Sequence, residues 1–292
     1  MHTNPLSSGP MPGKYQKIKI HGFHLKARTD LPTGWLPLLI ANLDKLPHAP
    51  LAPDRQWAFV NLPENHQNLE LFIKTYAPKD SRHSSFRRNH PLRRLLPRYA
   101  AKEAEAALRF QAKNLPAPEL YVFGEEWKKG IRYRGVVIME AVKGASAQSL
   151  LKHSPDLTLI GPVFRTIAEI HSCGLSHGDA HLPNFIWDQK QIKVIDIERS
   201  KKLTVKGQQA DLMNIMLSIL IEIEDTALIT EGLRLYEETG PALPFHKGEA
   251  IKEALRRAKR IHRSASRSAR FNIARPPVIE FEEFEKALKN RS

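Results

Sequence analysis

One stretch decides the fold prediction for this chain: His177-Gly178-Asp179-Ala180-His181-Leu182-Pro183-Asn184. It places an aspartate and an asparagine in one short loop, and Asp196 follows at the end of the apolar run Ile192–Ile195. This order is typical of a phosphotransferase catalytic loop followed by a metal-binding aspartate. Asp179 is suited to accept the proton of an attacking hydroxyl. Asn184 and Asp196 offer the hard oxygen atoms that Mg²⁺ prefers, so we expect them to hold that ion against nucleotide phosphates.

The flanks of this stretch support the same prediction. Upstream, apolar residues recur at the spacing of one helix face: Ile160, Val163, Phe164, Ile167, Ala168 and Ile170. Gly174 is suited to end that helix in a left-handed conformation. Downstream, the pattern predicts two short strands, Phe185–Asp188 and Ile192–Asp196, around a Gln-Lys-Gln turn. The alternative is that Asp179 and Asn184 only cap turns, but the helix before them and the hairpin after them favour a catalytic loop.

The composition permits a folded protein with a substantial core. The chain has 292 residues, of which 41% are hydrophobic, enough for one two-lobed unit or two modest domains. Cys173 is the only cysteine, so no internal disulfide can form, which fits a reducing compartment. The longest apolar candidate, Leu212–Ile223, is shorter than a membrane span and contains polar residues. Residues 1–13 are polar and Pro-rich and have no apolar signal core, so we expect a disordered leader there.

The chain is strongly basic, with a formal net charge of +14 at pH 7. Basic residues crowd two segments: Lys79, Arg82, Arg87, Arg88, Arg93, Arg94 and Arg98 in the first, and Arg256, Arg257, Lys259, Arg260, Arg263, Arg267 and Arg270 in the second. Either segment alone is equally well explained as a solvated helix face, but the two together favour an anionic partner. We find no zinc-ligand or aromatic readout motif of a nucleic-acid-binding module, so no nucleic acid is expected as partner.

The upstream half offers a lysine and a glutamate for nucleotide binding. A kinase holds the phosphates with a lysine on a strand, which a glutamate on the following helix orients. Lys74 lies in the strand-like run Leu69–Tyr76 and is our candidate, the alternative being an ordinary edge-strand lysine. The helix-forming segment Tyr99–Phe110 offers Glu103 and Glu105. We favour Glu103 because apolar residues share its helix face, and Glu105 remains an open alternative.

A nucleotide base is expected to bind after the strand Tyr133–Met139. Glu140 and Val142 lie in the predicted inter-lobe hinge, where adenine would bond to backbone groups. A glycine-rich loop over the phosphates is not expected, because Arg55–Asn68 contains no glycine; an Asn-rich turn is the candidate substitute, since Asn tolerates left-handed backbone angles.

Two features follow the hairpin. The first separates this chain from protein kinases, and the second adds a candidate residue that would support the catalytic loop. Asp196 is followed by Ile197 and Glu198 rather than by Phe-Gly, which argues against a phosphorylation-switched activation segment. A strongly apolar helix is predicted to begin near Gln209, with Asp211 in its first turn. In kinase-like folds an acid at this place braces the catalytic loop. A helix cap explains Asp211 equally well, and both roles can hold.

These motifs resemble those of known phosphotransferases. The stretch His177–Phe185 resembles the H-G-D-x-H-x-x-N motif of aminoglycoside and choline phosphotransferases and of bacterial lipopolysaccharide core kinases, the Kdo-kinase and heptose-kinase group. The second group is the closer match. It is similar in Phe72–Tyr76, in the Arg-rich stretch Arg87–Arg98, in Ala100–Ala104 and in Leu115–Pro118. The resemblance covers roughly residues 55–225.

The resemblance implies an α+β, two-lobed protein-kinase-like fold, with a small β-rich N-lobe at residues 14–139 and a larger helical C-lobe at residues 140–292. It implies ATP and Mg²⁺, with Asp179 as catalytic base, Asn184 and Asp196 as metal ligands, and Lys74 paired with Glu103. The implied reaction is phosphorylation of a sugar hydroxyl on a lipid-linked oligosaccharide, at the cytoplasmic face of the inner membrane, where the enzyme would be peripheral. We expect the Arg87–Arg98 cluster to serve the acceptor and the membrane surface.

Other functions remain as alternatives. A soluble small-molecule kinase of the aminoglycoside or choline type would need an acidic cleft for cationic acceptors, which the basic tail after Leu243 argues against. A protein kinase is disfavoured by the missing Phe-Gly after Asp196. A non-catalytic scaffold need not keep Lys74, Asp179 and Asn184 together with Asp196. The acceptor sugar, its hydroxyl and the oligomeric state do not follow from the sequence.

Overall fold

The computed structural model describes residues 14–31, 33–49, 52–62, 69–76, 99–128, 131–154, 156–188, 190–263 and 278–280. The chain forms two compact units, and each is described by itself. The sheet unit comprises residues 1–114, 119–141 and 275–292, and the helical unit comprises residues 115–118 and 142–274. The predicted leader and the Arg87–Arg98 cluster lie outside the described residues.

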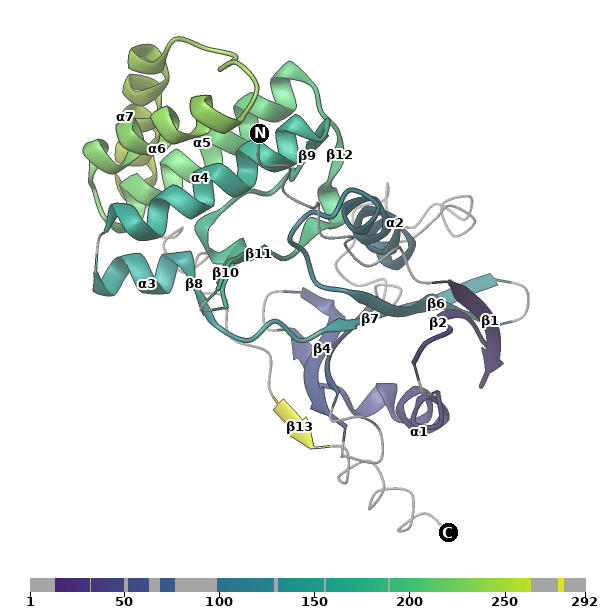
Figure 1. Ribbon diagram of the computed structural model, residues 1–292. Coiled ribbons are helices and arrows are strands. Elements are labelled where there is room, and N and C mark those ends of the chain that lie inside the picture. Colours follow the sequence, from purple (N-terminus) through teal and green to yellow (C-terminus); the bar gives the residue numbers. More distant parts are fainter. Residues whose placement is uncertain are drawn as a thin grey trace. The chain divides into compact units, whose positions relative to one another are not determined.

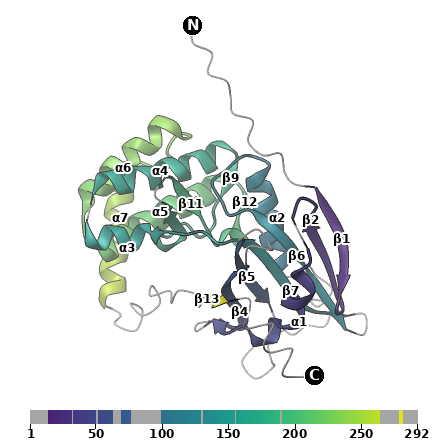
Figure 2. The same ribbon diagram turned by 60° about the horizontal axis from the view of Figure 1, so that its bottom comes forward.

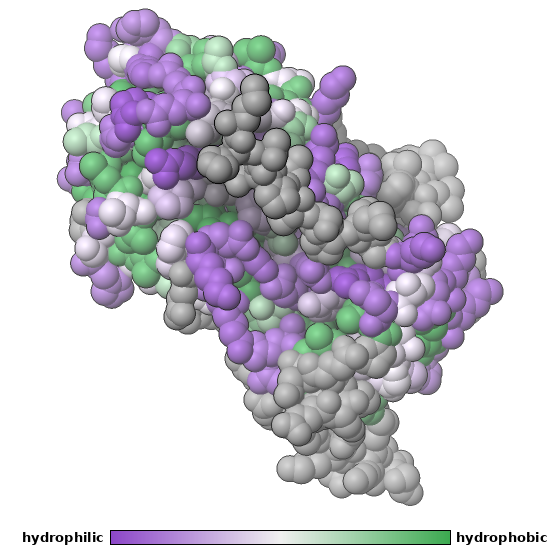
Figure 3. All heavy atoms as spheres, viewed as in Figure 1, coloured by the Kyte–Doolittle hydropathy of each residue, from purple (hydrophilic) through white to green (hydrophobic). Residues whose placement is uncertain are grey.

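The sheet unit is built on one sheet with the strand order β1-β2-β6-β7-β5-β4-β13, and β3 pairs with β4. Its pairings are antiparallel except that of β13 with β4, which is parallel. The strands are β1 Tyr15–Ile20, β2 Phe23–Arg28, β3 His48–Ala49, β4 Ala52–Asn61, β5 Glu70–Tyr76, β6 Leu120–Lys128, β7 Ile131–Glu140 and β13 Val278–Glu280. Hydrophilic side chains gather over β1 and β2 (Figure 3), because β1 has no fully buried residue and β2 exposes His24 and Lys26 between buried residues.

Two helices lie on opposite faces of this sheet (Figures 1 and 2). Helix α1, Leu36–Ala41, joins one core cluster with alternate residues of the strands, among them Ile73 of β5. Helix α2, Tyr99–Gln111, packs on the other face, against β6, β7 and β5. Because successive side chains of a strand point to opposite faces, Ile73 enters the α1 core while Lys74 faces α2.

The helical unit carries the predicted catalytic stretch. Its helices are α3 Ala147–His153, α4 Leu157–Ser172, α5 Val205–Glu222, α6 Thr226–Thr239 and α7 Lys247–Arg263, and the short 3-10 helices are η4 Leu182–Asn184 and η5 Ile197–Arg199. Its strands are β8 Ala145–Ser146, β9 Leu175–Ser176, β10 Phe185–Trp187, β11 Ile192–Val194 and β12 Lys201–Lys202. Helix α4 packs against α6, and α5 packs against α7 (Figure 1). None of the helices in the described ranges has the length and apolar composition needed to cross a bilayer.

The predicted mixed architecture, with a sheet part followed by a helical part, is confirmed. The border between the units follows Ala141, compared with the predicted border after residue 139. The predicted C-lobe, 140–292, also includes Val278–Glu280, but the structure pairs these residues with Phe59–Asn61 of the sheet unit. Parallel pairing between strands so far apart in the chain leaves no local signal in the sequence.

Candidate active site

The catalytic stretch follows directly from helix α4. All six apolar residues of the predicted helix face are fully buried. The helix ends at Ser172 with Cys173 as its C-cap, and Gly174 takes the predicted left-handed conformation with φ 74°. Strand β9 then pairs with β12. Gly178 has φ 83°, and a Cβ on it would lie 2.5 Å from the carbonyl oxygen of Arg199. Only glycine therefore fits this point of the loop.

The Asp211 side chain binds the backbone of this loop through two hydrogen bonds. Its Oδ2 accepts a hydrogen bond from the His177 N–H at 2.7 Å, and its Oδ1 accepts one from the Gly178 N–H at 2.8 Å. Asp211 is fully buried. Of the two roles considered for it, the cap is wrong: α5 begins at Val205 with Thr204 as its N-cap, so Asp211 lies inside the helix. The bracing contact is present, and hydrogen bonds to a buried carboxylate are among the stronger ones.

The Asp179 carboxylate lies between two basic side chains. Its Oδ1 is 3.5 Å from His181 Nε2 and 3.7 Å from Arg199 Nη1. Burial lowers the pKa of His181, and the nearby Asp179 opposes that shift. The backbone carbonyl of Asp179 accepts from the His181 N–H at 2.8 Å and from Asn184 Nδ2 at 2.8 Å. The loop therefore fixes Asp179 through its backbone and leaves the carboxylate partly exposed.

Asn184 and Asp196 have the chemistry of a site for a hard cation. Because the Asn184 nitrogen donates to the loop, its amide oxygen is the atom left to meet a ligand. The Ile195 N–H donates to the Asn184 carbonyl at 2.9 Å, which links the residue before Asp196 to the loop. Asp196 itself takes a left-handed conformation with φ 56° and ψ 43°. Such strained backbone is uncommon outside glycine and gathers at functional sites. These oxygen donors fit Mg²⁺, which takes few protein ligands beside phosphates.

His177, the first residue of the motif, has a structural place in the loop. Its ring is fully buried and stacks on Phe185 at 5.9 Å between ring centres. Burial lowers its pKa, so the ring is neutral near pH 7. The Asp179 N–H donates to His177 Nδ1 at 3.3 Å, so the ring proton belongs on Nε2. The neutral ring thus accepts a bond from the residue whose carboxylate is the candidate base.

In the sheet unit, the structure places Lys74 beside Glu103. Lys74 Nζ lies 3.3 Å from Glu103 Oε1, and both side chains are almost completely buried. The Tyr76 hydroxyl donates to the other carboxylate oxygen, and the Lys74 ammonium lies 5.5 Å from the Tyr76 ring centre. Glu105, the open alternative, is exposed and pairs with Arg109 at 3.4 Å. Two charges removed from water need good geometry and further hydrogen bonds, and Tyr76 supplies one.

The predicted hinge residues lie at the border of the two units. The Glu140 N–H donates to the Glu119 carbonyl at 2.8 Å, and its side chain accepts from the Glu119 N–H at 3.2 Å. The Ala141 N–H donates to the Glu70 carbonyl at 3.0 Å. Val142 donates none of the backbone hydrogen bonds found among the described residues, so its N–H is available to a ligand.

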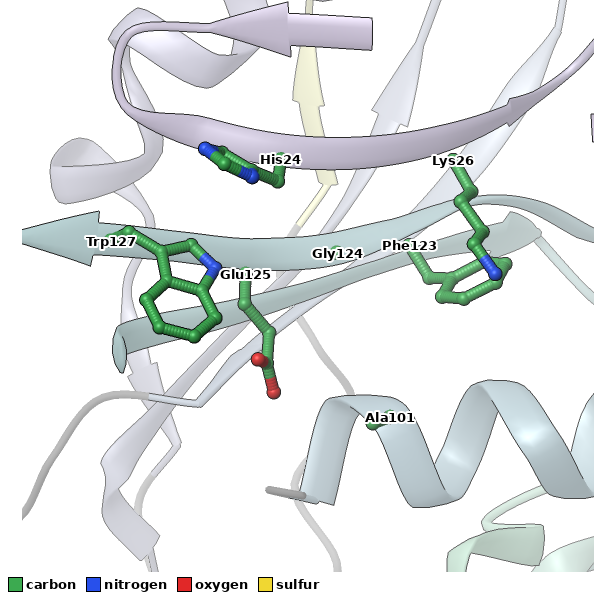
Figure 4. A pocket seen from close by; sticks show the side chains of 7 residues that line it. All are labelled: His24, Lys26, Ala101, Phe123, Gly124, Glu125 and Trp127. Atoms are coloured by element: carbon green, nitrogen blue, oxygen red, sulfur yellow. The ribbon is translucent and has the colours of Figure 1, made fainter. Parts of the chain in front are cut away.

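A small hollow in the sheet unit is separate from these residues. It has a volume of about 180 Å³ and lies between β2, β6 and the start of α2 (Figure 4). Glu125 and Trp127 point from β6 toward α2, and the Lys26 ammonium lies 5.6 Å from the Phe123 ring centre. Ligand pockets usually measure about 300–1,000 Å³. The hollow is smaller than that, and none of the predicted site residues lines it.

Four residues near the candidate site had no role in the sequence prediction. His181 lies in the quoted motif, two positions after Asp179, so its place in the loop was a usable signal. Tyr76 shares a strand face with Lys74 by the alternation of the strand. Arg199 and His171 reach the site only through the fold: Arg199 lies beside Asp179, and His171 Nε2 lies 3.2 Å from Asp211 Oδ2.

Comparison with known proteins gives one family and several similar folds. The model of the "Lipopolysaccharide kinase (Kdo/WaaP) family" matches residues 65–232. The solved structure of WaaP in complex with acyl carrier protein has a TM-score of 0.53 and 16% identity, covering 75% of this chain and 91% of that one. No curated protein matches the chain. The likeness to WaaP, at this identity, shows the fold.

Two further solved structures match with lower scores. An aminoglycoside-3'-phosphotransferase of type VIII has a TM-score of 0.46 and 14% identity, covering 76% of this chain and 97% of that one. A divergent Toxoplasma kinase that lacks the glycine-rich loop has a TM-score of 0.44 and 15% identity, covering 77% of this chain and 92% of that one.

Proposed function

The chain belongs to the lipopolysaccharide kinase (Kdo/WaaP) family, and from this premise we propose that it transfers the γ-phosphoryl group of ATP, with Mg²⁺, to a sugar hydroxyl of lipopolysaccharide core. Family membership makes it a phosphotransferase that acts on a sugar hydroxyl. ATP, Mg²⁺, the residue roles and the membrane location are our proposals. The observation that carries the assignment of the phosphoryl-transfer site is the loop that Asp211 holds by two hydrogen bonds to its backbone, with Asp179 and Asn184 on it.

In this proposal Asp179 accepts the proton of the sugar hydroxyl as the hydroxyl oxygen bonds to the γ-phosphorus and the bond to the ADP oxygen breaks. His181 and Arg199 hold its carboxylate in place. Mg²⁺, when bound, neutralises phosphate charge and orients the reacting groups. Asn184 and Asp196 would hold the ion through their oxygen atoms.

Lys74 is proposed to contact the nucleotide phosphates, and Glu103 with Tyr76 keeps its ammonium in one position. Backbone groups of Glu140 and Val142 are proposed to bond to adenine. The Val142 N–H, which makes no backbone bond among the described residues, supports this assignment. No glycine lies between Gly34 and Gly124, so the segment before Lys74 offers no glycine-rich loop for the phosphates.

We propose that the enzyme works at an anionic membrane surface, on a lipid-linked acceptor. Helix α7 supports this location, because it buries alanines and exposes basic side chains. Its exposed Lys259 and Arg260 have no ion-pair partner in the described part of the chain. Beside it, Met213 and Phe245 line a groove of about 570 Å³. Apolar and cationic groups side by side suit anionic lipids.

The test is a phosphoryl-transfer assay with labelled ATP and purified lipopolysaccharide core acceptors, in Mg²⁺ and in chelator. Aminoglycosides, choline and basic proteins serve as competing acceptors in separate reactions. We expect label only in the core acceptor and only with Mg²⁺. Labelling of an aminoglycoside or choline instead would assign the chain to the soluble small-molecule kinases. Labelling of basic proteins alone would make it a protein kinase.

A further inference from the structure

Buried side chains from three helices form a hydrogen-bond chain that ends on the catalytic loop. Gln208 Nε2 of α5 donates to the Tyr236 hydroxyl of α6 at 2.8 Å. The Tyr236 hydroxyl lies 2.8 Å from His171 Nδ1 of α4, and His171 Nε2 lies 3.2 Å from Asp211 Oδ2. Asp211 then accepts the two loop N–H groups. Gln208 and Tyr236 have no place in the proposed chemistry.

The contact of Gln208 with the Ala242 carbonyl fixes the donor and acceptor of every hydrogen bond in this series. Gln208 Nε2 also lies 2.8 Å from the carbonyl oxygen of Ala242. An amide oxygen at that place would face another acceptor, so the nitrogen must be there and Gln208 must donate to Tyr236. The Tyr236 hydroxyl uses its single hydrogen on the remaining neighbour, His171 Nδ1. His171 Nδ1 therefore accepts, and the ring proton lies on Nε2, where it donates to Asp211.

The opposite arrangement has a clear cost. With its single ring proton on Nδ1, His171 would point the lone pair of Nε2 at Asp211 Oδ2, and both groups are buried. Two acceptors facing each other without water repel, and each loses a hydrogen bond. Burial also raises the pKa of Tyr236 to about 12, so its hydroxyl keeps the hydrogen at neutral pH.

We propose that Tyr236 and Gln208 are positioning residues for phosphoryl transfer: they hold the His171 ring in the orientation from which its Nε2–H donates to Asp211, and Asp211 thereby keeps both oxygens aimed at the catalytic loop. This rests on the proposed function for the catalytic step, but the hydrogen bond from His171 to Asp211 does not. Tyr236→Phe is the suitable variant. It removes the hydroxyl and keeps the edge-to-face contact of the two rings, whose centres lie 5.7 Å apart.

The first experiment determines where the His171 ring proton lies, and how fast it exchanges, by nitrogen NMR of histidine-labelled full-length protein. The variant His171→Gln identifies the His171 signals. We expect wild-type His171 to carry its proton on Nε2 and not on Nδ1, and we expect that proton to exchange faster with solvent in Tyr236→Phe, because the ring is then held less firmly against Asp211. A proton on Nδ1 in the wild type, or an unchanged exchange rate in Tyr236→Phe, would overturn the proposal. This readout stands even if no acceptor in the assay is phosphorylated.

The second experiment measures ADP release with purified lipopolysaccharide core. We expect Tyr236→Phe to lower kcat by about three- to tenfold, the effect of one lost hydrogen bond, with the KM for ATP unchanged. Tyr133→Phe, at a tyrosine that is 42% exposed, is the matched control and should behave as wild type. A purely structural role for Tyr236 predicts lower thermal stability with a wild-type kcat and a wild-type exchange rate of the His171 Nε2 proton.

The third experiment is a double-mutant cycle. In His171→Gln the side-chain amide can donate to Asp211 whether or not Tyr236 has a hydroxyl. Tyr236→Phe should therefore have no further effect on kcat in that background. Additive losses in the two variants would mean that Tyr236 acts by a route that does not pass through His171, and would refute the proposal.

Discussion

At the scale of single residues, the backbone and the side chain of Asp179 have different roles in the loop. The backbone carbonyl of Asp179 accepts two hydrogen bonds from its own loop, and its carboxylate lies beside the side chains of His181 and Arg199. The backbone position of Asp179 is therefore fixed, while its carboxylate remains accessible to the hydroxyl group of a substrate. A base in this position must be a carboxylate, because an amide binds a proton poorly.

We expect Asp179→Asn to lower kcat by about 10²–10⁴-fold with an unchanged fold, because general-base catalysis contributes that much. Transfer to the core acceptor and thermal unfolding would be measured together. Asp188→Asn is the matched control, since Asp188 accepts two N–H groups of its own turn and asparagine can do the same. Near wild-type turnover by folded Asp179→Asn would contradict the assignment of the base.

The two glutamates of α2 allow a second prediction at this scale. Glu103→Gln removes the negative charge that lies beside the buried Lys74 ammonium, so the free energy of unfolding should fall by about 3–5 kcal/mol. Glu105→Gln removes an exposed pair and should cost less than about 1 kcal/mol. Denaturant titration of both variants measures the difference. Equal losses would show that the Lys74–Glu103 pair contributes no more than a surface ion pair.

At the scale of elements, helix α5 is the support on which the loop is built. Its N-terminal half places Gln208 and Asp211 on one face, and Asp211 reaches the loop that follows β9. A helix of this length, with most of that face fully buried, is a rigid base for a loop. We therefore expect α5, more than the hairpin β10–β11, to determine the position of this loop.

We expect Asp211→Asn to lower kcat and to speed hydrogen exchange of the His177 and Gly178 amides, because one carboxylate oxygen becomes an NH₂ group that cannot accept. A buried hydrogen bond to a charged group contributes about 1.5–3 kcal/mol. Asp225→Asn is the control: Asp225 accepts two N–H groups as the N-cap of α6, and asparagine caps as well. Unchanged exchange in Asp211→Asn would mean that the loop holds itself.

At the scale of the whole molecule, the proposed roles of the site residues do not account for the large positive charge. The net charge is +14, and one predicted basic segment, Arg87–Arg98, lies outside the described residues. The other segment begins in α7, whose side chains can be assessed. A charge of this size attracts anionic surfaces over a distance set by the salt concentration, about 10 Å at 0.1 M.

We expect replacement of four α7 side chains, Lys252, Arg256, Lys259 and Arg260, by Gln to weaken binding to vesicles containing anionic lipid, at about 1 kcal/mol for each side chain near the surface. The loss should shrink as salt rises, and the KM for ATP should not change. The same replacement of exposed Lys14, Lys17, Lys19 and Lys26 in the sheet unit removes equal charge elsewhere. Equal loss from both variants would mean that net charge, and not α7, drives binding.

The sequence by itself determined the local elements and the identity of the candidate side chains. Helix α4 with its glycine end and the hairpin β10–β11 follow from periodicities and turn residues within a few positions, because helix and strand patterns are short-range physical constraints. The motif likewise named Asp179, Asn184 and Asp196, since their chemistry and spacing are visible in the chain.

Only the tertiary structure decided which partner each side chain meets. The choice of Glu103 over Glu105 depends on which side of α2 packs on the sheet. The chain from Gln208 through Tyr236 to Asp211 joins three helices, and β13 pairs with β4 from the other end of the sequence. These contacts arise from the packing of elements far apart in the chain, and a single sequence carries no local periodicity that records them.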